Sequence, residues 1–139
     1  MFDEPSRASL LAVAEETLKS EVLPTLDSTT KYAALMVLSA LGMARREIAA
    51  GFEPPRQVLD AYADLYGQDN VHRAGFDAAE RMASLNRDLA QEIRAGEHDD
   101  ELDTPCQVHN VLRTLVIERL KLSNPRFLLE SEYSQPSRD

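Results

Sequence analysis

The chain has 139 residues, of which 43% are hydrophobic, and this length and composition fit one packed globular domain better than a disordered chain. Fifteen Lys and Arg against 24 Asp and Glu give a formal net charge of −9, a surface that repels phosphate backbones and anionic lipid headgroups. We therefore expect neither a nucleic-acid-binding protein nor a membrane-bound one.

The ends and the cysteine content indicate where the chain works. Residues 1–5 lack the basic region and apolar stretch of a secretory signal. The longest apolar run, residues 33–44, is well short of the ~20 residues that a membrane span needs. Cys106 is the single cysteine, which excludes an intramolecular disulfide. We expect a cytoplasmic protein.

Two helices are predicted in the first third of the chain. Four-residue spacing of apolar side chains predicts a helix from Ser6, its N-cap, to Leu23, where Pro24 stops it. A second helix is predicted from the polar cluster at residues 27–30 to residue 50, with Gly51 just past its end.

The second predicted helix is apolar on nearly all sides between residues 33 and 44, so we expect it to be the central helix, surrounded by the others. Gly42 lies inside it at a cost of about 1 kcal/mol relative to Ala. We interpret this glycine as room for the close approach of another helix backbone, with a ligand crevice as the alternative.

A third helix is predicted from the Glu53-Pro54-Pro55 start to Gly67, followed by a polar loop at residues 68–73. A fourth helix is predicted over residues 76–95. Its apolar stripe is predicted to comprise Ala79, Met82, Asn86, Leu89 and Ile93. Asn86 interrupts this stripe, so either its side chain is buried and hydrogen-bonded or the phase is wrong by one residue.

The last helix is predicted from Thr104-Pro105 to Asn124. Its inner face is predicted to carry Val108, Val111, Leu112, Leu115, Val116 and Leu122. Residues 127–129 are expected to form a short apolar clasp and residues 131–139 a flexible tail. The fold class is therefore all-α, a single domain over residues 1–139 built as a bundle of about five helices with an apolar central second helix.

The polar residues do not form a recognisable catalytic or metal-binding pattern. Cys106 and His109 share one helix face, but a zinc site needs about four ligands at matched spacing. We interpret this pair as structural and expect His72 and His98 to be solvated. The acidic run at residues 97–103 lacks the register of a calcium-binding loop. We expect no catalytic residue, no cofactor and no metal, and therefore no enzyme.

Two polar patches remain as candidate contacts for a protein partner. One is Arg45-Arg46-Glu47, at the end of the most apolar helix, and the other is Asn124-Pro125-Arg126-Phe127, at the end of the last helix. Arg and aromatic side chains are favoured anchors at interfaces. The structural alternative is that an arginine pairs with an acid on a neighbouring helix, Asn124 caps carbonyls and Phe127 seals the base of the bundle.

Three segments resemble a family of small, uncharacterised bacterial helical proteins. These are residues 33–48, the stretch Leu-Ala-Gln-Glu-Ile-Arg-Ala-Gly at 89–96, and Lys-Leu-Ser-Asn-Pro-Arg-Phe-Leu at 121–128. One departure is Ser39, where the family usually has Asn, so a role tied to that amide does not carry over. Members of this family look like companions of aminoglycoside-phosphotransferase-like kinases and acyl-CoA dehydrogenases.

The resemblance implies an accessory subunit that binds and stabilises or activates such a kinase in (hydroxy)acyl-CoA catabolism. The alternative hypothesis is a helical bundle that binds a small molecule, an acyl group or acyl-CoA, between small residues such as Ala33, Ala40 and Ala83. A homodimer is a further expectation, because five short helices leave broad apolar faces to cover.

Overall fold

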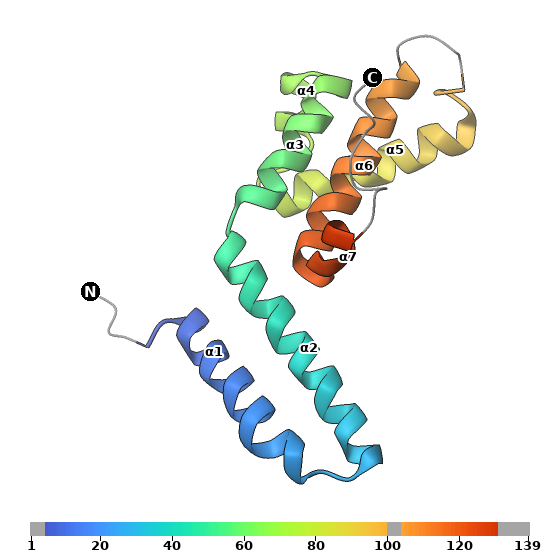
Figure 1. The fold of residues 1–139 in the computed structure, drawn as a ribbon. Helices are drawn as coiled ribbons and strands as arrows, with labels where there is room; N and C mark the ends of the chain where they lie inside the picture. The colour runs from blue at the N-terminus through green and yellow to red at the C-terminus, as the bar shows by residue number, and fades with distance from the viewer. Residues whose placement is uncertain (1–4, 100–103, 131–139) are drawn as a thin grey trace. The chain divides into compact units, whose positions relative to one another are not determined.

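The computed structural model describes residues 5–99 and 104–130, and side chains at 5–99 and 107–129. All regular structure in these ranges is helical (Figure 1), which confirms the expected all-α class. No helix in the described part of the chain is both long enough and apolar enough to cross a bilayer. The predicted tail at 131–139, most of the acidic run and the side chain of Cys106 lie outside the described residues.

The contacts of the chain divide it into two compact units, Met1–Gly51 and Phe52–Asp139. The first unit contains α1 (Arg7–Thr17), a π-helical turn η1 (Leu18–Val22), a 3-10 turn η2 (Leu23–Thr25) and α2 (Ser28–Ala50). The second contains α3 (Glu53–Tyr66), α4 (Gln68–Arg73), α5 (Ala78–Ala95), α6 (Thr104–Ser123) and α7 (Pro125–Glu130).

The first unit is a helical hairpin in which the start of the first helix and both ends of the second lie where predicted. The first α-helix ends at Thr17 and not at Leu23, because π-helical and 3-10 turns follow it and the 3-10 turn includes Pro24. The Ser6 hydroxyl accepts a hydrogen bond from the Ser9 backbone N–H at 3.1 Å, as an N-cap does. The Asp27 carboxylate caps α2 by accepting from the next backbone N–H groups, including that of Thr30 at 3.0 Å, and these bonds lower the pKa of Asp27. Gly51 ends α2 with φ at +57°, a conformation that favours glycine.

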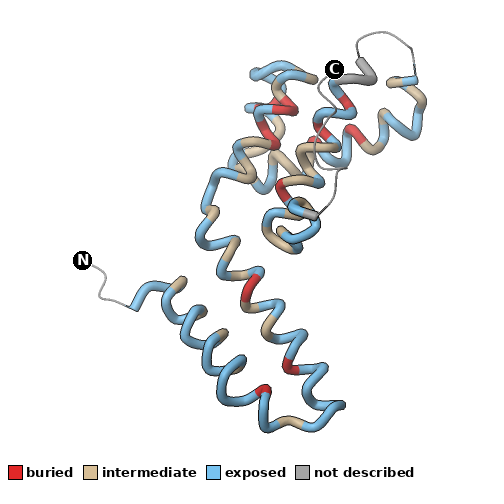
Figure 2. Tube along the Cα trace, viewed as in Figure 1, coloured by how far each residue is buried: buried red, intermediate tan, exposed pale blue. Residues whose placement is uncertain are grey.

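The packing of α2 differs from the expectation of a surrounded central helix. Within its unit, α2 packs along α1 and the two turns that follow α1. Few residues of the hairpin are buried, and in Figure 2 both helices are mostly exposed. The buried ones in the described part of this unit are Leu23, Ala34 and Gly42. One neighbouring helix covers only one side of an apolar helix, so the remaining sides face outwards.

The second unit holds the hydrophobic core, and α3 packs mainly against α6 and α5. The predicted loop at 68–73 is wrong, because these residues form the short helix α4. Gly67, with φ at +85°, ends α3 and allows α4 to begin at the next residue, and α4 places Val71 in the core. The buried core residues are Val58, Leu59, Ala61, Tyr62, Val71, Leu85, Leu89, Val108 and Val111.

The phase of α5 is off by one residue at several positions of the predicted stripe. Leu85 is buried where Asn86 was predicted, and Ile93 is exposed, whereas Leu89 is buried as expected. The helix begins one residue after Asp77, whose carboxylate accepts from the Glu80 backbone N–H at 2.8 Å. Gly96, in the left-handed conformation, ends the helix as predicted.

Candidate functional site

Three ionisable side chains meet where the end of α3 faces the end of α5. The Tyr66 hydroxyl donates to Glu92 Oε2 at 2.6 Å, and His98 Nε2 lies 2.8 Å from the same oxygen. The prediction that His98 is solvated is wrong, because its side chain is only 13% exposed. The left-handed turn at Gly96 folds the chain back so that the imidazole packs against Glu92. The sequence signal was the glycine two residues before the histidine.

A stacked pair of tyrosines continues this cluster towards the core. The rings of Tyr62 and Tyr66 lie 5.9 Å apart and 7° from parallel, and the Tyr62 hydroxyl donates to Asn86 Oδ1 at 2.6 Å. Asn86 is hydrogen-bonded but exposed, so of the two alternatives the one-residue error in phase is correct. Burial raises the pKa of Tyr62 to about 12 and also raises the pKa of Tyr66, whose bond to Glu92 adds to the effect. Both phenols are donors near neutral pH.

An open pocket of about 280 Å³ adjoins the cluster. Asp88 and Glu92 stand one helical turn apart along its wall, and polar groups such as Arg73 make up much of the rest. Its remaining lining residues are Tyr66, Asn70, Ala74, Ser84 and Leu85. Glu92 already accepts from two side chains, so the cluster fastens α5 to α3 and to the turn that follows α5.

No group of three or more His, Cys, Asp and Glu residues in the described ranges is arranged to hold a metal ion. His109 is exposed on α6, and its predicted neighbour Cys106 lies outside the described side chains.

The first predicted patch is tied to α1. Arg45 Nε donates to Glu15 Oε2, which matches the structural alternative for this arginine. Gly42 makes room for this pair, because a Cβ at this glycine would lie 2.9 Å from Glu15 Oε1 and 3.2 Å from the Arg46 guanidinium. The close approach predicted at Gly42 is therefore to side chains and not to a backbone. Glu47 is exposed at the end of the helix.

The second predicted patch connects α6 and α7. The Asn124 backbone N–H donates to the Leu120 carbonyl at 2.8 Å, and the Asn124 carbonyl accepts from the Phe127 N–H at 3.1 Å. Pro125 opens α7, and Arg126 is exposed. Phe127 is 49% exposed, so it is at most a partial seal of the second unit. The two patches belong to different units of the chain.

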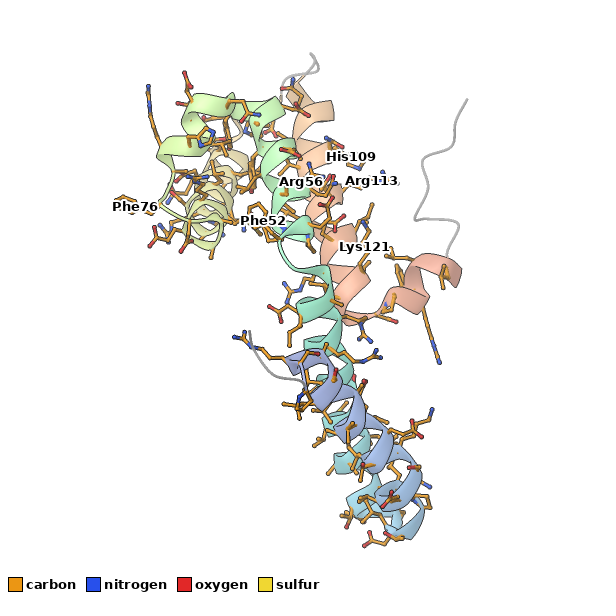
Figure 3. The ribbon with its side chains drawn as sticks, turned by 90° about the vertical axis from the view of Figure 1, so that its left-hand side faces the viewer. Phe52, Arg56, Phe76, His109, Arg113 and Lys121 are labelled. Carbon is orange, nitrogen blue, oxygen red and sulfur yellow. The ribbon has the colours of Figure 1, made fainter. Side chains whose placement is uncertain are left out.

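One face of α6, exposed at Leu112 and Val116 and half-buried at Arg113, was missed by the sequence analysis. Leu112 and Val116, predicted on the inner face, are 42% and 57% exposed, whereas Val108 and Val111 are buried. Residues 109, 112, 113 and 116 follow the spacing of one helix face, and we call His109, Leu112, Arg113 and Val116 the α6 ridge. Figure 3 shows His109 and Arg113 projecting from α6, followed along the helix by Lys121. This face was missed because α6 has more apolar residues than there are buried positions along it, so some of them remain exposed.

A second exposed face lies on α2, and we call Tyr32, Met36 and Met43 the α2 seam. Their exposed fractions are 68%, 52% and 38%. Tyr32 and Met36 each stand two residues from Ala34, which is buried. Met43 stands two residues from Arg45, which pairs with Glu15 of α1. Two residues turn a helix by about 200°, so the α2 seam faces away from α1. Leu35, Val37 and Ile48, at other positions around α2, are also exposed.

Residues 24–127 match a family model described as a domain of unknown function, DUF6285. The chain belongs to the DUF6285 family. The match covers most of the chain, so the resemblance seen in the sequence is confirmed at the level of an uncharacterised helical family. No curated protein and no solved structure matches the chain.

The DUF6285 match runs through both units. It begins within η2 and includes the whole of α2, α3 and α6, so that the α2 seam, the polar cluster and the α6 ridge all lie inside it. Both predicted patches also fall within the matched range, the second ending at its last residue, Phe127.

Proposed function

We propose that this DUF6285 chain is a non-catalytic accessory subunit that binds and stabilises or activates a phosphotransferase-like kinase in (hydroxy)acyl-CoA catabolism. The observation that supports a binding role is the exposed α6 ridge. The class of partner and its place in acyl-CoA catabolism are supported by the resemblance of residues 33–48, 89–96 and 121–128 to the companion family.

The α6 ridge has the spacing of a helix that inserts into a groove on another protein. Its residues stand at i, i+3, i+4 and i+7, the pattern by which helical segments anchor in apolar grooves. Val116 supplies the most exposed apolar side chain of the ridge, with Leu112 one turn before it. Arg113 adds a positive charge to this face, and His109 lies one turn before it along α6 (Figure 3). The fitting partner is therefore an apolar groove with an acidic rim.

The charge of the second unit makes this ridge distinctive. Residues 52–139 carry ten Lys and Arg against 17 Asp and Glu, a net charge of −7. An acidic partner surface would be repelled by most of this unit and attracted by the ridge, so the charges select one orientation of docking. The polar cluster formed by Tyr66, Glu92 and His98 fastens α5 to α3, against which α6 packs, and thereby supports the ridge on a rigid base.

An accessory role fits the chemistry of phosphoryl transfer. A kinase of this class supplies its own nucleotide-binding lysine, metal-binding carboxylates and base. A bound helper adds to the rate by holding kinase loops or the acyl-CoA site in the reactive geometry. This role requires a surface of the helper and no reacting group from it.

The test is co-expression with an aminoglycoside-phosphotransferase-like kinase from the same genome, followed by co-purification and measurement of turnover. We expect the unchanged chain to co-purify and to raise turnover. The variant Val116→Asp places a carboxylate against the acidic rim and should abolish both effects. The matched control is Ile93→Asp, an exposed apolar position on α5, which should retain both. Separate elution and unchanged turnover with the natural chain would refute the proposal.

A further inference from the structure

The residues of the α2 seam, together with Glu47 on the same face, stand at positions that are symmetric about one point of the helix. This midpoint lies between Ser39 and Ala40. Met36 and Met43 are equally distant from this midpoint, and so are Tyr32 and Glu47. These residues recur at spacings of four, seven and four, which keeps them on one face of a helix. A surface that meets its own copy across a two-fold axis must be self-complementary in this way.

We propose that the α2 seam is the face on which two copies of this chain associate, with the two α2 helices antiparallel. The two-fold axis passes between Ser39 and Ala40. Met36 of one copy then packs against Met43 of the other, twice. The small side chains at the axis let the two helix backbones approach closely. This inference is independent of the kinase proposal, which uses the α6 ridge of the other unit.

Tyr32, at one end of the seam, and Glu47, beyond its other end, match in the same register. Tyr32 and Glu47 are both exposed, and neither the Tyr32 hydroxyl nor the Glu47 carboxylate is part of the capping interactions of α2. In the antiparallel pair, the Tyr32 hydroxyl of one copy lies beside the Glu47 carboxylate of the other and can donate to it. In a parallel pair, each carboxylate would instead face its own copy, and like charges would repel.

The charge of the hairpin favours a second copy over a highly charged partner. Residues 1–51 carry five Lys and Arg against seven Asp and Glu, a net charge of −2. The stretch from residue 33 to residue 44 has no charged residue. Two such hairpins repel each other weakly. A strongly basic or acidic partner would find no complementary charge on the seam.

The length of the α2 helix limits how tightly two copies can associate through the α2 seam. A helix of 23 residues is about 35 Å long. Contact between two such helices lies at the low end of specific interfaces, where association is weak or transient. We therefore expect a dimer with a Kd of the micromolar order, in which α1 of each copy stays on the outer side of its own α2.

The experiment measures the mass of the full chain by sedimentation between about 1 and 200 µM. We expect a monomer at the low end and a dimer at the high end. Met36→Glu places a charge in the seam of each copy and should raise the Kd at least 100-fold. The control is Val13→Glu on α1, which lies on the side of α1 away from α2 and is 65% exposed. It should leave the Kd within about threefold.

A pair of substitutions tests the antiparallel register. Met43→Lys alone should also weaken the dimer, and Met36→Glu combined with Met43→Lys in one chain should restore it. In the antiparallel dimer each glutamate faces a lysine of the other copy, whereas a parallel dimer would bring like charges together. An equal mixture of the two single variants should likewise associate. Circular dichroism checks that each variant keeps its helices.

Three results would overturn the proposal. The first is a chain that stays monomeric at about 200 µM. The second is a dimer that Met36→Glu leaves intact, which would place the interface elsewhere. The third is a double variant that remains monomeric although its helices are intact, because the register would then be wrong.

Discussion

The two units of this chain use similar helices in opposite ways. The second unit buries branched and aromatic side chains from four helices and links α3 to α5 with hydrogen bonds from two tyrosines. The hairpin contains the most apolar helix of the sequence, yet most of its large side chains are exposed. The difference teaches that the apolar content of a helix does not decide whether it is central. What decides is how many other helices can reach its sides.

The largest effect that separates the units should come from a core truncation. Leu89→Ala removes a side chain that is 2% exposed and should destabilise the second unit by about 2 to 5 kcal/mol. Met36→Ala in the hairpin removes a similar volume from an exposed site and should cost less than about 0.5 kcal/mol in dilute solution. Urea unfolding followed by circular dichroism measures both. Similar losses for the two variants would contradict the contrast between the units.

High pH should weaken the second unit through Tyr62. The pKa of this phenol is raised from an ordinary value of 10.0 to about 12, mainly by burial, so the folded state favours the protonated form. The unfolded chain therefore loses its proton first, and stability that is intact below about pH 10 should fall as the pH rises to about 12.

The measurement is the urea midpoint as a function of pH. The size of the loss should be about 2 to 3 kcal/mol, from the shift of two pKa units. Tyr62→Phe removes one of the two phenols whose pKa is raised and should reduce the slope, leaving the part that Tyr66 contributes. A variant that keeps the full slope would show that another group is responsible.

Loss of a single hydrogen bond should have a smaller effect. Tyr66→Phe removes the donor to Glu92 and should cost about 1 to 2 kcal/mol, since bonds to charged acceptors are the stronger ones. Tyr62→Phe should cost less at neutral pH, because its acceptor Asn86 is exposed and can turn to water. Thermal unfolding of the two variants gives the order, and the reverse order would contradict the assigned roles.

The ion pair of the hairpin should contribute least. Arg45→Ala removes the partner of Glu15, and the arginine side chain is 45% exposed, so the loss should be below about 1 kcal/mol. Salt screens exposed pairs, and the difference between the natural chain and the variant should shrink in high salt. If Arg45→Ala instead lowered the free energy of unfolding by several kcal/mol, and salt did not change this loss, the Glu15 carboxylate would be behaving as a buried charge left without its partner.

Much of the fold could be predicted because residues close in the sequence determine where most helices begin and end. Ser6, Asp27 and the glycines at 51, 67 and 96 act on neighbouring backbone groups, and their predicted positions are confirmed. The burial pattern could not be predicted in the same way. Leu112 and Val116 carry the same apolar signal as Val108 and Val111, and only packing against α3 distinguishes the buried pair.

The polar cluster escaped prediction for a related reason. Tyr66 and Glu92 are 26 residues apart, and no spacing rule connects them. His98 joins them only because the turn at Gly96 reverses the chain. The Arg45 pair with Glu15 was anticipated as one alternative, because the second helix had to place its charges near another helix. Local signals therefore located the arginine, while the tertiary contacts supplied its partner.

The stacked rings of Tyr62 and Tyr66 give the second unit its own optical reporter. The chain has no tryptophan, so its near-ultraviolet dichroism comes mainly from tyrosine, and two phenols held 5.9 Å apart and nearly parallel should dominate that signal. Loosening of α3 from α5 would extinguish it while the helical far-ultraviolet signal persists. A stopped-flow trace at the two wavelengths would therefore time side-chain melting separately from the loss of helix, with no attached dye.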